Sequence, residues 1–501
     1  MNVCRFGLAV LGFFSHFLQA QDIKKPDQYE VETGAYTAAK NRTPFWLQTN
    51  QFGIVPTTTP ILTVRTALRA DYDTTRINNR KLDYGYGIRL VGNFASEQGG
   101  LRMPELYAKV RYRAVELSVG RRQDILGLGD STLSSGSYSW SGNAFPIPKI
   151  QLAIPQFTPL PFTRGWVSVM GTFAHGYLNA TGFVNHSMLH QKSLYVRVGR
   201  VANTVRLYGG FVHQAVWGGE IADLSLINNN DIAREKQLPS RFRDYFYVAT
   251  GLRLPGSDNN RLTNFDYTNR IGNHLGQVDL GADIDLVRYN LFLYRQSVFD
   301  DGSLYYLLNI ADGLNGVRLR RNNPDALVRD VLVEYLNTTS QGGSVFVIDD
   351  PMRRGRDDYF NHSQFRDGWS YRQRGIGTPF ITPALGRAGQ WPFGTFTDNN
   401  RVRVFHVGLA GSLPTRGWFV FSDRVQYQAK ISVSRNYGTY AMPLAKRKDQ
   451  LSGLLSLTAP LTVMKGLLVV SSIAVDEGEL YTNNIGLYVG VRKVWHKTLL
   501  R

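Results

Sequence analysis

Aromatic and basic side chains are interleaved in one segment of the chain, Asp357 to Phe380. Aromatic rings can stack on the apolar faces of sugar rings, and guanidinium groups pair with carboxylates or phosphates through two parallel hydrogen bonds. An acidic sugar would use both kinds of contact. The segment therefore predicts a polysaccharide-binding loop, with these candidate residues: Tyr359, Arg366, Trp369, Tyr371 and Arg372.

A similar mixture occurs at Trp140, and again beside Phe162, where Arg164 and Trp166 follow closely. We therefore add Trp140, Arg164 and Trp166 to the candidates. A purely structural role remains open for each of them. In that case the aromatic rings pack the loops against the interior of the fold, and the arginines face acidic residues such as Asp279 and Asp283.

Catalytic and metal-binding patterns give no comparable signal. The sequence contains neither a G-x-S-x-G elbow nor an H-E-x-x-H motif. His362 precedes Ser363, but neighbours in sequence do not make a catalytic dyad, and we expect His362 to donate a hydrogen bond in a loop. Asp279, Asp283 and Asp285 alternate with apolar positions along one strand and are better explained as lumen-facing charges that balance the arginines than as paired catalytic carboxylates. We expect no enzyme activity, no metal and no cofactor.

The elements that would position these loops show period-two alternation, which is typical of strands. In Leu82 to Phe94, one face carries Tyr, Ile and Leu side chains, while the other is polar or glycine apart from Val91. Val278 to Leu286 and Trp418 to Val433 alternate in the same way. A globular strand has about 5–6 residues and a transmembrane strand about 9–11. Further candidate strands of this kind lie near 61–73, 101–112, 115–121, 165–174, 193–201, 204–214, 289–299, 327–337, 402–411, 451–459, 467–475 and 486–495.

These strands predict an all-β fold, a transmembrane antiparallel β-barrel of about 16–18 strands with long outer loops. The long irregular segments are 122–163, 215–243 and 349–400. A soluble β-sandwich or solenoid is the alternative. Strand length and the absence of a fixed repeat count against it. The apolar stretch Leu451 to Val470 is not a helical span, because Pro460 interrupts it.

The amino terminus has the pattern of a cleavable signal peptide, residues 1–20, with Arg5 ahead of an apolar run that ends near Ala20. Residues 21–60 are predicted as a short N-terminal periplasmic segment and residues 61–501 as the barrel. The only cysteine, Cys4, falls in the part removed, which excludes disulfides.

The formal net charge of +18 predicts a polyanionic partner. Export argues against nucleic acid, which leaves acidic polysaccharide and outer-membrane lipid. A solvated basic surface without a specific ligand remains the alternative. Trp495 near the end of the last strand is typical of the signal read by the barrel-insertion machinery, although the tail HKTLLR follows it.

Several segments resemble the capsule-assembly outer-membrane proteins of the Wzi family. They are TPFWLQTNQFG from Thr43, VGRRQDILGLGDSTLSSGSYSWSGNAFPIPKIQL, FTRGWVSVMGTFAHGYL, LHQKSLYVRVG, YGGFVHQAVWGGE and NHSQFRDGWSYRQRGIGTPF. The resemblance implies a barrel of about eighteen strands in the outer membrane of a Gram-negative-type bacterium. It implies a surface lectin that helps to hold capsular polysaccharide, with 21–60 at the periplasmic end. The 122–163 and 349–400 loops would occlude the lumen or contact sugar. The resemblance does not assign ligand binding to any particular residue of this sequence.

Three functions are therefore weighed. A non-catalytic barrel that binds and helps to anchor or assemble capsular polysaccharide fits the basic charge and the aromatic–arginine loops. A diffusion porin for anionic solutes needs an open lumen, against which the long loops argue. An outer-membrane hydrolase of lipid A or phospholipid has only isolated His and Ser residues in its favour.

Overall fold

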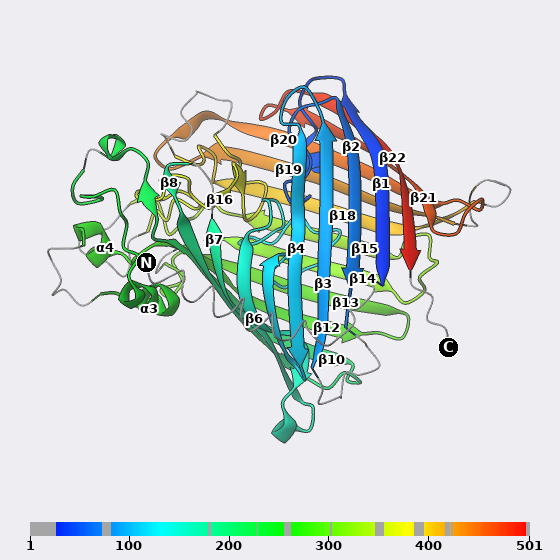
Figure 1. Cartoon of the computed structure of the whole chain (residues 1–501), viewed down its shortest axis with the longest axis horizontal. Helices are drawn as coiled ribbons and strands as arrows, with labels where there is room; N and C mark the ends of the chain where they lie inside the picture. The colour runs from blue at the N-terminus through cyan, green and yellow to red at the C-terminus, as the bar shows by residue number, and fades with distance from the viewer. Residues whose placement is uncertain are drawn as a thin grey trace, which may run out of the picture.

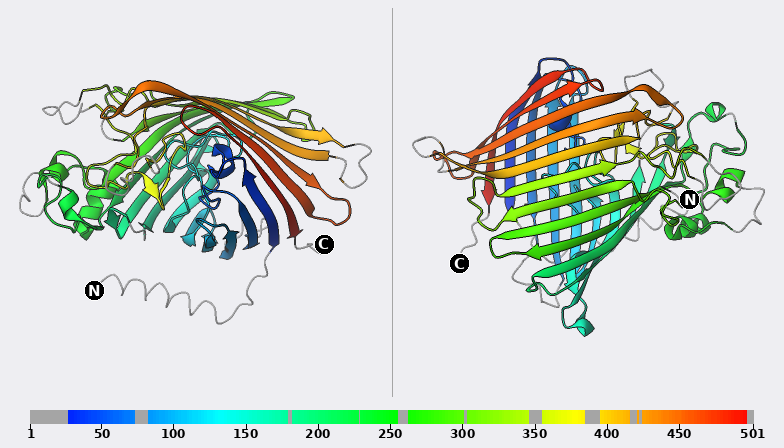
Figure 2. Two further views of the ribbon diagram at one scale, coloured as in Figure 1. Left: turned by 90° about the horizontal axis from the view of Figure 1, so that it is seen from above. Right: turned by 180° about the vertical axis from the view of Figure 1, so that it is seen from behind.

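A computed structural model of the chain shows a closed barrel of eighteen antiparallel strands (Figures 1 and 2). It describes residues 27–72, 82–178, 182–227, 229–254, 262–300, 303–345, 355–384, 395–415, 421 and 424–496. The strand number confirms the prediction of 16–18. The predicted signal peptide lies outside the described residues. No helix in the described ranges is long and apolar enough to cross a membrane.

The wall is built from strands of seven to eighteen residues. Their bounds are β1 Gln28–Ala38, β2 Ile61–Ala70, β3 Asp83–Phe94, β4 Gly100–Tyr112, β5 Val115–Arg121, β6 Pro148–Pro159, β7 Val167–Leu178, β9 Ser187–Val198, β10 Val205–Trp217, β12 Asn273–Asp285, β13 Tyr289–Phe299, β14 Gly313–Arg321, β15 Asp330–Asn337, β18 Val402–Pro414, β19 Arg424–Gly438, β20 Pro443–Pro460, β21 Leu467–Gly478 and β22 Asn484–His496.

Short elements lie in the connections between these strands. They are the helices α2 Phe45–Gln48, α3 Phe242–Thr250 and α4 Asn264–Thr268, the 3-10 turns η2 Pro161–Thr163 and η3 Leu224–Leu226, and the two-residue strands β8 Val184–Asn185, β11 Glu220–Ile221, β16 Ser370–Tyr371 and β17 Arg374–Gly375. Strand β8 pairs with β11, and β16 pairs with β17.

The barrel closes where its first strand meets its last. β1 pairs with β2 on one side and with β22 on the other, from Gln28 opposite His496 to Ala38 opposite Gly486. Inside this seam the rings of Tyr36 and Tyr488 lie 4.3 Å apart. Closure leaves no unpaired sheet edge, which is the condition for a sheet to cross a membrane.

Alternation along each strand separates two environments. On β19, Lys430, Ser432 and Ser434 are buried inside the barrel, while Ile431 and Val433 are 53% and 41% exposed on its outer face. An apolar outer face against a polar inner face is the pattern of a lipid-facing wall. The predicted patterning is therefore confirmed in β19, whereas most of 418–423, the start of the predicted strand, lies outside the described residues.

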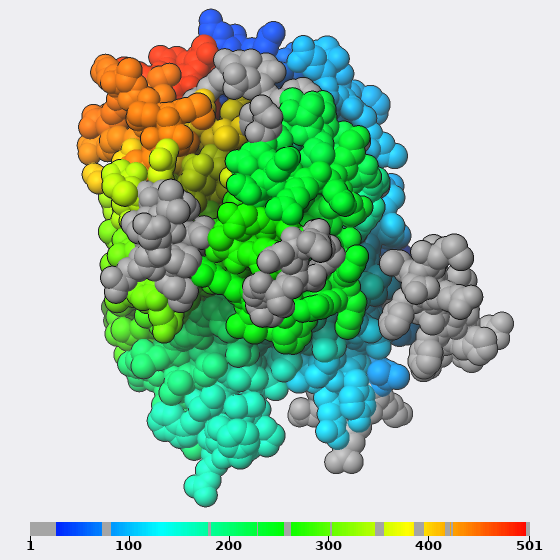
Figure 3. Space-filling view, turned by 90° about the vertical axis from the view of Figure 1, so that its left-hand side faces the viewer, coloured from blue at the N-terminus to red at the C-terminus, as the bar shows by residue number. Residues whose placement is uncertain are grey.

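The two ends of the barrel differ. β4 and β5 are joined by a two-residue turn, and β12 and β13 by three residues, at the end that holds Gln28 and His496. The connections at the other end are long, above all 122–147, 218–272 and 338–401. Figure 3 shows the 218–272 connection, in green, spread over the side of the molecule that is at the left of Figure 1. Short turns face the periplasm in such barrels and long loops face outward, so we call the second end the outer end.

The placement of residues 21–60 as a periplasmic segment is wrong for most of their length. Residues 28–38 form wall strand β1, and residues 39–60 connect β1 to β2 at the outer end. Strand β6 is likewise a wall strand inside the segment predicted as the irregular loop 122–163. Its prolines and the irregular register between Ile154 and Thr158 hide its alternation.

Candidate functional site

The connection 122–147 folds into the barrel and is fixed to the polar inner wall. Gln277 on β12 accepts hydrogen bonds from the Ser139 backbone N–H and hydroxyl at 3.0 and 2.9 Å. Gln296 on β13 accepts from the Tyr138 N–H at 2.9 Å and donates to the Leu128 carbonyl at 2.8 Å. These wall amides replace the water that the loop backbone would otherwise need.

Carboxylates on the wall strands also fix the connection 122–147 to the inner wall. Glu334 on β15 accepts hydrogen bonds from the Ser134 hydroxyl at 2.7 Å and the Ser135 N–H at 2.6 Å. Asp279 on β12 accepts from the Leu128 N–H at 2.9 Å and the Tyr195 hydroxyl at 2.7 Å. Asp279 thus holds the loop instead of facing an arginine, whereas Asp283 pairs with Arg206 at 3.1 Å.

A second segment enters the lumen between β1 and β2. Trp46 on α2 is 2% exposed, and its indole N–H donates to the Ser432 hydroxyl at 3.2 Å. Its ring lies 5.3 Å from that of His406 and 6.0 Å from that of Phe380. Segments far apart in sequence, around residues 46, 133 and 380, therefore form one core inside the barrel.

Four predicted binding residues belong to this core. Trp140 is 5% exposed, Trp369 is fully buried and donates to the Ser139 carbonyl at 2.9 Å, and Tyr371 is 2% exposed. Tyr359 is also fully buried, and its hydroxyl donates to Asp312 at 2.9 Å. Burial and neighbouring carboxylates raise the pKa of Tyr359 well above its ordinary value, so its hydroxyl stays protonated. For these four rings the packing role that the sequence left open is the one observed.

Arg164 and Trp166 are placed far from the other candidates. They lie in the connection between β6 and β7, which begins with η2. This connection is at the end of the barrel that holds the chain termini. Both are exposed, and Trp166 lies under the Arg200 guanidinium at 5.6 Å. The structure therefore does not bring them together with the long loops.

The remaining two candidates are arginines, and they differ. The Arg366 guanidinium is half-buried 5.2 Å from the Phe183 ring. Arg372 is exposed at the tip of the β16–β17 hairpin, 4.6 Å from the Phe145 ring. Arg372 and Gln373 have positive φ angles of 50° and 64°, as in the tight turn of a two-residue hairpin.

Arg372 is part of a group of cations that we call the arginine cluster: Arg102, Arg121, Arg372 and Arg374. Arg121 at the end of β5 lies 5.1 Å from the same Phe145 ring. Arg102 on β4 donates to the Gly53 carbonyl at 2.7 Å and is close enough to Arg372 for the two charges to repel. Arg374 donates to the carbonyls of Gln48 and Val55 at 3.2 and 2.5 Å.

No member of the arginine cluster forms a salt bridge with any residue in the described ranges. The Arg121 Nε atom is buried without a hydrogen-bond partner in the same ranges. Burial and the nearby Arg102 lower the pKa of Arg374 to about 10, so it remains charged at neutral pH. Positive charges gathered around an aromatic ring without counter-charges attract an anion.

The barrel wall is shorter at its outer end where the arginine cluster lies, because β5 ends before β4 does. The last pair between β4 and β5 joins Leu106 to Arg121, whereas β4 continues beyond it to Gly100. The loop 122–147 leaves the wall at this step, and the β16–β17 hairpin reaches it from the 338–401 connection. The outer ends of β4 and β5, the loop 122–147 and the β16–β17 hairpin therefore all contribute side chains to the arginine cluster and the Phe145 ring beside it.

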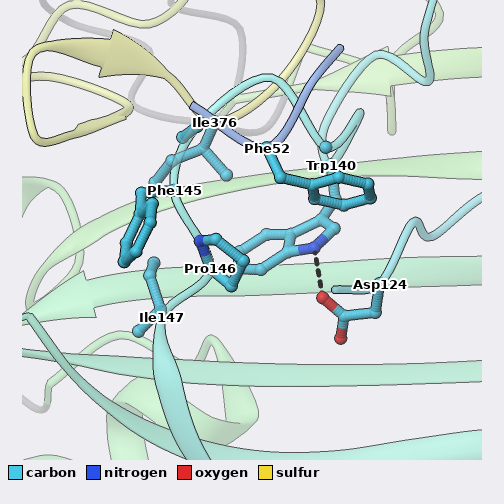
Figure 4. A pocket seen from close by; sticks show the side chains of 9 residues that line it. Phe52, Asp124, Trp140, Phe145, Pro146, Ile147 and Ile376 are labelled. Carbon is cyan, nitrogen blue, oxygen red and sulfur yellow. Dashed lines mark hydrogen bonds between the residues drawn. The ribbon is translucent and has the colours of Figure 1, made fainter. Parts of the chain in front are cut away.

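Behind Phe145 is a small apolar cavity, which Figure 4 shows from close by. It is lined by Phe52, Trp140, Phe145 and Ile376, with a volume of about 10 Å³ that suffices for one water-sized molecule at most. The Trp140 indole N–H donates to Asp124 at 3.0 Å, and Lys149 binds the other oxygen of that carboxylate at 2.6 Å. The cavity is too small for a sugar ring.

His362 shows no catalytic arrangement. Its Nδ1 atom accepts hydrogen bonds from the backbone N–H groups of Gln364 and Phe365, both at 3.2 Å. The expectation that it donates a loop hydrogen bond is therefore corrected, because a neutral ring nitrogen is the acceptor. The described residues contain no group of three or more His, Cys, Asp or Glu side chains that could hold a metal ion.

The comparison with family models decides the family. Residues 33–384 match the model described as capsule assembly protein Wzi, which is more than half of the chain. The chain belongs to the Wzi family. This confirms the resemblance seen in its motifs and places this Wzi-family barrel in the outer membrane of a Gram-negative cell.

One solved structure agrees with this fold. The chain is similar to Wzi of Escherichia coli, which is described as an outer-membrane protein involved in group 1 capsule assembly and as a carbohydrate-binding β-barrel. The TM-score is 0.58 at 13% identity, over 97% of this chain and 88% of that one. OccK5 of Pseudomonas aeruginosa has a TM-score of 0.45 at 10% identity, covering 93% and 97%, and OccAB4 of Acinetobacter baumannii has 0.44 at 9%, covering 94% and 99%. No curated protein sequence matches the chain.

Proposed function

We propose that this barrel is a non-catalytic protein that binds acidic capsular polysaccharide and helps to anchor or assemble it at the cell surface. The observation that carries the proposal is the arginine cluster, which gathers guanidinium groups without counter-charges around the Phe145 ring. The carbohydrate-binding description of the Escherichia coli Wzi barrel supports the same conclusion.

The chemistry expected of the cluster is recognition and not turnover. Arg372 and Arg121 would pair with a sugar carboxylate, while the buried Phe145 ring lies against both guanidinium groups and supports them. Backbone carbonyls already hold Arg102 and Arg374, which keeps their charges in place before a ligand arrives. A filled lumen leaves little support for the diffusion porin.

The test compares cell-bound with shed polysaccharide in a deletion strain that carries wild-type protein or the double variant R121Q/R372Q. Each lost charge-assisted hydrogen bond is worth about 1.5–3 kcal/mol, so the double variant should bind at least about tenfold more weakly. We expect the polysaccharide to be made normally but released to the medium.

The matched control is R113Q/R321Q, which removes two exposed arginines from the end of the barrel that holds the chain termini. It should retain the polysaccharide as the wild type does. Equal retention by R121Q/R372Q, with a folded barrel of normal heat-dependent gel mobility, would remove the arginine cluster from the binding site.

A further inference from the structure

A second set of arginines lies on the outer face of the wall, on strands far from the arginine cluster. We call it the outer arginine row: Arg401, Arg403, Arg435 and Arg447. Arg403 on β18 is directly opposite Arg435 on β19, and Arg435 is opposite Asp449 on β20. Arg447 is two residues from Asp449 and thus on the same face of its strand. Arg403, Arg435 and Arg447 are all exposed.

The outer arginine row lies immediately above the apolar belt. The next outward-facing residues toward the chain termini are Phe405, Val433 and Leu451, which are 52%, 41% and 38% exposed. Arg403 and Arg435 therefore stand where the outer end of the hydrocarbon layer meets the head groups. Tyr437 and Tyr440 accompany them, with Arg403 5.8 Å from the Tyr437 ring and Arg401 3.9 Å from the Tyr440 ring. Aromatic side chains of this kind are typical of a membrane interface.

Three of the four charges in this row have no salt bridge within the described residues. Arg447 binds Asp449 at 2.7 Å, but within the described part of the chain Arg401, Arg403 and Arg435 form no salt bridge. Among the described residues, Arg403 donates to neutral oxygens of Asn337 and Thr339, at 3.3 and 3.4 Å. Like charges directly opposite on neighbouring strands are destabilising. An anion bound between Arg403 and Arg435 would remove that repulsion.

We infer that the outer arginine row binds the phosphate groups of a phosphorylated lipid in the outer leaflet. The acyl chains would lie on Phe405, Val433 and Leu451, which continue the lipid-facing belt, while the guanidinium groups above hold the phosphate. Arginine suits this task because its planar donors match phosphate oxygens two at a time. The inference is independent of the proposed polysaccharide binding, because it uses the outside of β18, β19 and β20.

The test is native mass spectrometry of the purified full-length barrel in detergent after incubation with lipid A. Wild-type protein should retain lipid A, and R403Q/R435Q should retain it about tenfold more weakly, which is the loss of roughly one charge-assisted hydrogen bond. R113Q/R321Q carries the same change of charge at the other end of the barrel and should retain lipid A as the wild type does. Enzymatically dephosphorylated lipid A should be retained equally weakly by all three proteins.

Each alternative outcome overturns the inference. Equal retention of lipid A by wild type and R403Q/R435Q would show that the row does not hold it. Tight binding of dephosphorylated lipid would show that the acyl chains alone decide. Loss of polysaccharide binding by R403Q/R435Q with undiminished lipid A retention would assign the row to the saccharide. Competition by millimolar inorganic phosphate alone, without lipid retention, would show a free-anion site and not a lipid site.

Discussion

At the scale of single residues, the surroundings of a side chain determine its role more than its neighbours in sequence do. Trp369 and Arg372 are three residues apart in the same aromatic–basic segment. Trp369 is fully buried and bonded to Ser139, whereas Arg372 is exposed beside Phe145. Changing Trp369 would therefore disturb the loop packing, and Arg372 is the better test of binding. The sequence could predict the interleaved segment but not which of its members face outward.

His362 gives the loop 355–384 a dependence on pH. Its ring lies 5.3 Å from Phe265 and 5.4 Å from Phe365, and burial lowers its pKa to about 3 from an ordinary value of about 6.5. The docked loop thus binds fewer protons than the released loop between these two values, so its docking is strongest above about pH 6.5 and weakens as the pH falls toward 3. We expect faster amide exchange in residues 358–366 at pH 4.5 than at pH 7, after correction for intrinsic rates.

The variant H362N provides the control for this prediction. An asparagine carbonyl can accept the same two backbone hydrogen bonds but does not titrate in this range. Asp358 and Asp367 have pKa values raised by burial, which favours the docked loop as the pH falls. If exchange in the wild type and in H362N changed equally with pH, His362 would not be the titrating group.

At the scale of elements, strong alternation made most wall strands predictable. The bounds predicted for 115–121 and 289–299 are those observed for β5 and β13. Strands β1, β6 and β14 were missed for different reasons. β1 stands before the expected start of the barrel, β6 contains Pro148, Pro155 and Pro159, and β14 is rich in arginine. The inward positions of β14 include Arg318, which lies 3.4 Å from Asp130 in the lumen.

The arginine cluster could be predicted only in part for the same reason. Arg372 and Arg374 belong to the recognised loop, but Arg102 and Arg121 lie on β4 and β5, more than two hundred residues earlier. Only the pairing of strands and the inward course of 122–147 bring them together. A single sequence contains no signal for a contact over that separation.

Helix α2 provides a prediction at this scale. Replacing Trp46 by alanine should remove a fully packed ring and lower the free energy of unfolding by about 3–5 kcal/mol. W46F keeps an aromatic ring and should lose less than W46A: the bond to Ser432, about 1 kcal/mol, and the packing of the missing part of the indole. Denaturant unfolding in detergent, followed by gel mobility, measures both. W166A, which changes a ring that is 47% exposed, should have little effect; a loss as large as that of W46A would contradict this account of the core.

At the scale of the whole molecule, polypeptide fills the lumen of the barrel, which is therefore not an open pore. The 122–147 loop, helix α2 and the segment around Trp369 occupy the lumen as one core. In planar bilayers we therefore expect no large steady conductance from the wild type. Deleting residues 127–143, with a short Gly-Ser bridge in their place, should produce conducting channels, provided that gel mobility confirms a folded barrel. A large steady conductance from the wild type would contradict the filled lumen.

The early end of β5 also affects the thickness of the bilayer that surrounds the barrel. β5 has seven residues, and at about 3.3 Å per residue and a tilt of about 40° it spans roughly 18 Å along the membrane normal. A usual apolar band is about 25 Å tall. Such hydrophobic mismatch is relieved by local thinning of the membrane. We therefore expect lipid head groups to lie deeper beside β5 than elsewhere around the barrel, so that a saccharide lying on the membrane surface would be lowered toward Arg121 and Arg372.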